Sequence, residues 1–134
     1  MIKFLFLTFT LVLSACAIGP SLSEQHISAA RTMAIETSVY YQKHGKTATI
    51  NAGKDAVKRT LKDPSSAEFT NLRIGAFEGG KLVCGNVNAK NSYGGYVGVK
   101  PFAASPSAAV IYTDYDYAFI TEFANVSIIQ GCLK

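Results

Sequence analysis

The densest group of side chains with binding chemistry comes after the second cysteine of the chain. It combines amide, amine, hydroxyl and phenol groups in Asn88, Lys90, Asn91, Ser92, Tyr93 and Tyr96. If residues 86–90 form a strand, Asn86, Asn88 and Lys90 share one face, because side chains alternate between the faces of a sheet. Such groups around a glycine-rich turn are suited to a glycan or the end of a peptide, so these residues are the candidate partner-binding residues.

The same residues can also be explained by a structural role in stabilising a turn, with no partner involved. Asn88 and Asn91 can hydrogen-bond backbone groups at a turn, while Gly94 and Gly95 adopt positive φ angles that other residues avoid. Tyr112, Tyr115, Tyr117 and Phe119 form a second aromatic concentration. Tyrosines of this kind occur both in recognition surfaces and in small cores, and the sequence does not choose between the two.

Catalytic chemistry has little support. A hydrolase needs a nucleophile with a base, or paired carboxylates. His26 and His44 have no Ser/Asp or Cys partner close in sequence, and Asp114 with Asp116 is more typical of helix caps. We therefore expect a protein that is not an enzyme, with no cofactor and no metal site.

The first sixteen residues have the pattern of a bacterial lipoprotein signal peptide. Lys3 precedes a short apolar run, 4–13, which ends in Leu13-Ser14-Ala15-Cys16. A membrane-spanning helix needs about 20 apolar residues, so this run is typical of a cleavable export signal. We expect cleavage after residue 15 and lipidation of Cys16, where two or three acyl chains would give a stable anchor.

The location follows from that anchor. Ala17 follows the cysteine, in place of the aspartate that retains many lipoproteins at the inner membrane. By similarity to Gram-negative lipoproteins, we expect the outer membrane, with the protein facing the periplasm. Residues 16–23 would be a lipidated tether containing Gly19 and Pro20.

Two cysteines remain once Cys16 is assigned to lipid. Cys84 and Cys132 are an even pair in an oxidising compartment, which favours a structural disulfide. The formal net charge of the whole chain is +4 with scattered basic residues, so nucleic-acid binding is poorly supported. Residues 24–134 have a length suited to one domain.

The periodicity of apolar residues predicts two N-terminal helices. The first begins at a serine cap, either Ser21 or Ser23, and ends at Gly45. The second runs from about Asn51 to Lys62 and has a lysine stripe of Lys54, Lys58 and Lys62. Pro64 ends it, and Asp63 can cap a short turn. The lysine stripe is either a solvated face or a weaker candidate for contact with lipid or glycan.

The centre of the chain predicts strands at 69–77, 81–87, 96–103 and 108–113, with a hairpin turn at Glu78-Gly79-Gly80. Helical spacing returns at 119–130, and Gly131 can cap that helix. The prediction is an α+β domain: a small antiparallel sheet of three or four strands, two N-terminal helices, a C-terminal helix and one disulfide.

Two segments resemble a family of small uncharacterised bacterial and prophage-encoded exported proteins. They are LKDPSSAEF at 61–69 and CGNVNAKNSYGGYVG at 84–98, with a late cysteine. The resemblance implies no activity and no catalytic residue. Our leading expectation is a lipid-anchored, non-enzymatic binding or structural module whose partner is an envelope protein or glycan. The alternative is a prophage-encoded lipoprotein that modifies the envelope or blocks a phage receptor, and a cell-wall or glycan hydrolase is a weaker third reading.

Overall fold

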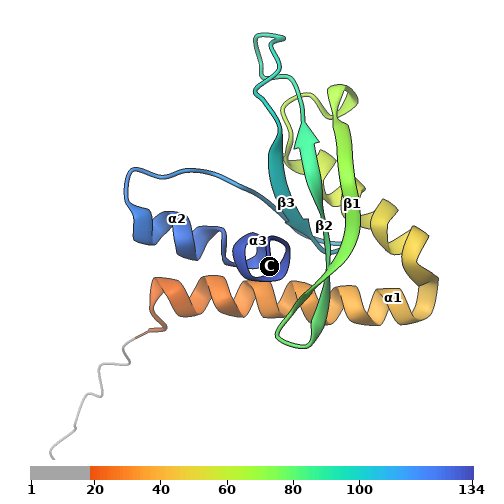
Figure 1. The fold of residues 1–134 in the computed structure, drawn as a ribbon, viewed down its shortest axis with the longest axis vertical. Coiled ribbons are helices and arrows are strands. Elements are labelled where there is room, and N and C mark those ends of the chain that lie inside the picture. The colour runs from red at the N-terminus through yellow and green to blue at the C-terminus, as the bar shows by residue number, and fades with distance from the viewer. Residues whose placement is uncertain (1–18) are drawn as a thin grey trace, which may run out of the picture.

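The computed structural model describes residues 19–134 (Figure 1). The expected signal peptide, 1–15, and the expected lipidation site, Cys16, lie outside the described residues. Within residues 19–134, no helix is both long enough and apolar enough to cross a membrane.

The first element of the described residues is one long helical element, α1, Leu22–Thr60. Ser21 is its N-cap: the Ser21 hydroxyl accepts a hydrogen bond from the Glu24 amide, and the Glu24 carboxylate accepts one from the Ser21 amide. This reciprocal capping box decides between the two candidate serines, and it starts α1 two residues before the expected domain boundary at 24.

A sharp bend at Gly45 divides α1 into a first arm, 22–44, and a second arm, 46–60. Gly45 has φ 79° and ψ 176°, a backbone conformation available almost only to glycine. The predicted break at Gly45 is therefore present. The arrangement as two separate helices with a gap to Asn51 is not confirmed, because helical structure resumes directly after the bend.

The sheet has four antiparallel strands in the order β1-β2-β3-β4. Their bounds are Glu68–Phe77, Gly80–Asn88, Lys100–Ala104 and Ala109–Ile111, and a short 3-10 turn, η1, Pro64–Ser66, precedes β1. Glu78 and Gly79 connect β1 to β2 with φ angles of 46° and 80°, as a type I′ hairpin turn requires. The α+β fold and the antiparallel sheet are confirmed.

The third strand differs from its prediction. Residues 96–99 are outside β3, and Tyr96 makes only an isolated bridge with Lys90. Gly98 has φ 95°, which an extended strand does not accommodate. The paired part of the strand therefore begins at Lys100.

Both faces of β2 are buried, because the two arms of α1 lie on opposite sides of the sheet. Leu82 and Cys84 join the core formed with the first arm and the C-terminal helix, whereas Val83 and Val87 join the core formed with the second arm. The bend at Gly45 thus lets one helix cover two faces, with the sheet between its arms (Figure 1).

The expected single C-terminal helix is two short helices, α2, Ala118–Ala124, and α3, Val126–Gly131. The break falls at Asn125, which is buried and bonds through its side chain to both backbone groups of Thr113. Gly131 is not a left-handed cap. A Cβ atom at this position would lie 2.7 Å from Leu82 Cδ1, so the glycine permits close packing of α3 on β2.

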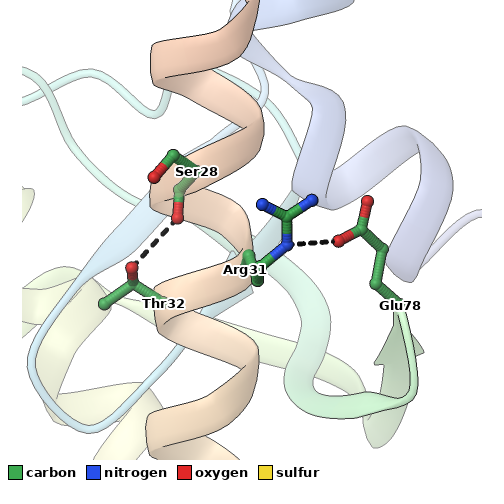
Figure 2. Close-up of polar contacts among 4 residues, drawn as sticks. All are labelled: Ser28, Arg31, Thr32 and Glu78. Atoms are coloured by element: carbon green, nitrogen blue, oxygen red, sulfur yellow. Dashed lines mark hydrogen bonds and ion pairs between the residues drawn. The ribbon is translucent and has the colours of Figure 1, made fainter.

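Two groups of side chains hold the arms of α1 against the turns of the sheet. Figure 2 shows Arg31 of the first arm reaching to Glu78 in the β1–β2 turn, with Nε 2.7 Å from the carboxylate. Further along the first arm, the Glu36 carboxylate accepts hydrogen bonds from Ser105 and Ser107 of the β3–β4 turn. Arg59 of the second arm donates to the Pro106 carbonyl of that same turn. The turn is therefore held by both arms.

The predicted cysteine pairing is confirmed at the level of geometry. Cys84 on β2 and Cys132 directly after α3 are at disulfide distance, with 5.6 Å between their Cα atoms. Arg73 of β1 donates a hydrogen bond to the Cys132 carbonyl. Cys132 is thereby attached to β2 through its sulfur and to the edge strand β1 through its carbonyl.

Candidate functional site

The loop between β2 and β3, residues 89–99, extends beyond the ends of the strands at the top of Figure 1. We call residues 63–68 together with residues 88–99 the distal surface. At the other end of the same strands, Gly80 contacts Ala34 of the first arm. The length of β2, at about 3.4 Å per residue, separates the distal surface from the first arm.

Asp63 builds the first part of this surface. Its carboxylate accepts hydrogen bonds from the amides of Ser65 and Ser66 and from the Ser65 hydroxyl, at distances between 2.5 and 3.3 Å. The Ser65 hydroxyl is the main cause that holds the Asp63 pKa below its ordinary value. The predicted capping of this turn by Asp63 is confirmed.

The turn is bonded to the loop across a long stretch of sequence. The Ser66 hydroxyl accepts a hydrogen bond from the Lys90 amide at 2.8 Å. The Tyr96 hydroxyl donates to the Glu68 carboxylate at 3.2 Å, and Lys90 Nζ lies 5.4 Å from the centre of the Tyr96 ring. Residues 63–68 and the loop 89–99 therefore meet in one surface.

Two asparagines hold the loop backbone. The Asn91 side-chain oxygen accepts from the amides of Tyr93 and Gly95, at 2.9 and 3.1 Å, and the Asn88 oxygen accepts from Gly98 at 3.1 Å. The turn reading of Asn88 and Asn91 is thus confirmed. Gly94 has the expected positive φ, whereas the other positive φ belongs to Gly98 and not to Gly95.

The fixed loop presents apolar and aromatic groups to solvent. Tyr93, at the tip, is 96% exposed. Tyr96, Val97 and Val99 are also exposed. Partial desolvation and the hydrogen bond to Glu68 raise the pKa of the Tyr96 phenol above its ordinary value. The loop can offer phenol hydroxyls, a partly shielded ammonium and apolar contact area to a partner.

All six candidate partner-binding residues lie in the distal surface, but they have different roles there. Asn88, Lys90, Asn91 and Tyr96 form the framework, and Tyr93 and Ser92 are exposed at the tip. Asp63, Ser66 and Glu68 were not recognised as members of the site. No local pattern in the sequence could have shown that residues 63–68 contact the loop 89–99.

The aromatic residues near the C-terminus divide between core and surface. Tyr112 is half-buried against the core of the first arm, whereas Tyr115, Tyr117 and Phe119 are exposed. In the lysine stripe, Lys54 is half-buried with Nζ 5.5 Å from the centre of the Phe69 ring, so part of this stripe packs against β1.

Outside the distal surface, the hydroxyl and carboxylate groups described next hydrogen-bond within or between helices and turns, and these contacts stabilise the fold. Ser105 and Ser107 donate directly to Glu36, and Thr32 donates to the Ser28 carbonyl within α1 (Figure 2). The Arg31–Glu78 pair is solvent-exposed, and such pairs contribute about 0–1 kcal/mol. Across the described part of the chain, no group of three or more His, Cys, Asp or Glu residues is arranged to hold a metal ion.

Comparison with known proteins adds no relative: no protein-family model, curated protein or solved structure matches this chain. The distal surface must therefore be interpreted from its own geometry.

Proposed function

We propose that the chain is a lipid-anchored envelope protein that acts as a non-enzymatic binding module through its distal surface. One observation carries the proposal. Two segments far apart in sequence bond to each other at the strand ends and hold an almost fully exposed tyrosine on a loop whose backbone is fixed by asparagine side chains. Loops fixed on a rigid scaffold are common carriers of recognition.

The exposed groups suit a partner with both apolar and hydrogen-bonding character. Tyrosine provides a large contact area at low conformational cost and is enriched in binding surfaces. Tyr93, Tyr96, Val97 and Val99 supply that area, and Lys90 supplies a cation beside it. An envelope protein or a glycan that carries carboxylates would match this combination.

The anchor supports the same reading from the sequence. The apolar run 4–13 and the lipobox ending at Cys16 are typical of a lipoprotein. With the anchor at the start of the chain, a surface at the far ends of the strands would be presented away from the membrane. Metabolic palmitate labelling of the wild type against Cys16→Ser tests the anchor, and label in both proteins would contradict it.

A photocrosslinking amino acid at position 93 tests the binding surface. The matched control is the same amino acid at Val39, which is also exposed but lies on the first arm. We expect a discrete crosslinked product from position 93 in intact cells, and weakening of that product by Tyr96→Ala. Products of equal yield and identity from both positions would show that the distal surface is not the binding site.

The lysine stripe provides the competing surface. Purified wild type, a Tyr93→Ala variant and a Lys54→Ala/Lys58→Ala variant would be compared for binding to the crosslinked partner, or to isolated cell-wall sacculi, at two salt concentrations. We expect the tyrosine variant to lose affinity and the lysine variant to retain it. The opposite result would assign binding to the stripe, whose charges are screened by salt.

A further inference from the structure

Three exposed aromatic residues lie together just before and within α2. Tyr115, Tyr117 and Phe119 are 47%, 64% and 57% exposed, and the rings of Tyr117 and Phe119 are 6.0 Å apart between centres. We call these three residues the aromatic end. Large exposed apolar groups that cluster in this way mark contact with another surface.

The aromatic end lies close to the start of α1. Figure 1 shows α2 beside the beginning of the first arm, and Tyr112 and Val126, which flank this region in sequence, pack in the same core cluster as Ile27. Leu22, the first residue of α1, is also exposed. Aromatic and apolar groups are therefore present where the described chain begins.

Covalent reach limits how far this region can be from the anchor. Cys16 precedes Leu22 by six residues, and a fully extended chain of that length spans about 20 Å at most. If Cys16 holds a lipid in the bilayer, the start of α1 lies within that distance of the membrane surface, and the aromatic end lies beside the start of α1.

The charges near these aromatics select among membrane surfaces. Residues 101–133 contain Asp114, Asp116 and Glu122 and contain no lysine or arginine. Anionic lipid would repel these carboxylates. The ammonium of a choline or ethanolamine headgroup would meet both carboxylates and tyrosine rings, and aromatic faces attract such cations. Tyrosine is also enriched at the interface between membrane and water.

We infer that the aromatic end rests on the surface of a zwitterionic phospholipid bilayer and orients the anchored protein with its distal surface away from the membrane. This inference depends on the lipid anchor of the proposed function. It does not depend on the identity of the partner at the distal surface. It assigns a role to residues 115–119 that their contribution to the core does not explain.

The absence of tryptophan from the chain makes the test direct. Single variants Phe119→Trp and Tyr93→Trp each place one reporter, at the aromatic end or at the tip of the distal loop. Full-length protein purified from bacterial membranes would be reconstituted into phosphatidylcholine vesicles that carry brominated acyl chains, which quench tryptophan at the membrane interface. Flotation of the vesicles establishes anchoring separately from orientation.

We expect Phe119→Trp to be quenched several-fold more strongly than Tyr93→Trp, and replacement of most phosphatidylcholine by phosphatidylglycerol to reduce that quenching while flotation is retained. Protein that does not float would contradict the anchor alone. Coupling the Cys16 thiol to a maleimide lipid would then supply an anchor, and the same comparison would be made. Equal quenching at both positions in floated protein, or stronger quenching at position 93, would overturn the inferred orientation.

Discussion

At the scale of single residues, Asn91 carries much of the order in the distal loop, because one side-chain oxygen accepts two backbone amides. Asn91→Ala removes that acceptor, and we expect faster hydrogen exchange at the amides of Tyr93 and Gly95. Asn91→Asp keeps an oxygen in place and serves as the matched control. Unchanged exchange in Asn91→Ala would show that the loop is ordered by other contacts.

Within the distal surface, the protonation of Asp63 is expected to make the stability of the fold depend on pH. Its pKa is lowered in the folded state, chiefly by the Ser65 hydroxyl, from an ordinary value of 3.8. A lowered pKa means that the carboxylate stabilises the fold above the unfolded-state pKa, and that this contribution is lost as pH falls through the folded-state pKa.

Asp63→Asn should therefore be less stable than wild type at pH 7, and the difference should shrink below about pH 4. Urea midpoints at pH 7, 5 and 3 measure this. Asp116→Asn, an exposed change elsewhere, is the control for loss of one negative charge. A difference from wild type that is constant over this pH range would show that the carboxylate charge is not responsible.

At the scale of elements, the bend of α1 depends on the backbone of Gly45. Apart from the adjoining helix backbone, no atom lies within 4 Å of a Cβ built there, so the cost of a side chain comes mainly from φ 79° and ψ 176°. Strain of this kind costs about 1–3 kcal/mol. We expect Gly45→Ala to lower the free energy of unfolding by that amount.

Gly95→Ala is the comparison for this change. Gly95 also has an open environment, but its φ is not in the positive region. Thermal melts of the two variants should separate them, with the larger loss at Gly45. Equal losses would mean that the bend is not under local strain.

The pairing of Cys84 with Cys132 connects two elements that are 48 residues apart in sequence. A loop of that length corresponds to about 4 kcal/mol in the chain-entropy description of disulfides. Because about 1 kcal/mol shifts the Tm of a domain of this size by about 3–6 °C, Cys132→Ser should melt far below wild type.

Reduction of the wild type separates the effect of the bond from that of the serine. Treatment with a reductant should lower its Tm toward that of Cys132→Ser, while the melting of the variant should not respond to reductant. A wild type that yields two alkylatable thiols when taken from an oxidising compartment would contradict the bond.

At the scale of the whole molecule, β2 contributes side chains to both hydrophobic cores, the one formed with the first arm of α1 and the one formed with the second arm. A Cβ at Gly53 in the second arm would lie 2.7 Å from the Cβ of Val83. Overpacking of this kind typically costs about 1–3 kcal/mol. Because the opposite face of the same strand contacts the first arm and α3, we expect Gly53→Ala to destabilise the whole domain as one cooperative unit.

Far-UV circular dichroism and tyrosine fluorescence would report the unfolding of Gly53→Ala. The two curves should coincide, since a single transition is the mark of one cooperative unit. Gly19→Ala, which precedes α1 and has no atom within 4 Å of a built Cβ, provides the control. Two separate transitions would show that each arm of α1 unfolds with its own layer.

The sequence by itself determined the features that depend on local chemistry. A serine cap at the start of the first helix, the break at Gly45, the hairpin at Glu78-Gly79 and the turn capped by Asp63 all follow from side-chain or φ preferences within a few residues, and the structure chose Ser21 over Ser23 as the cap. The pairing of Cys84 with Cys132 was predicted because only these two cysteines remain once Cys16 is assigned to lipid, and an oxidising compartment favours a disulfide. The expected lipid anchor at Cys16 also depends on sequence alone, and it remains a prediction.

Only the tertiary structure decided what depends on distant residues. Asn125 divides the C-terminal helix because its side chain bonds Thr113, and Gly131 is required by the approach of Leu82, so helical periodicity could show neither. The meeting of Ser66 with Lys90, and of Glu68 with Tyr96, exists because the strand register brings their segments to one end of the sheet. Such contacts are absent from local patterns, since the energy that favours them appears only when the chain is folded.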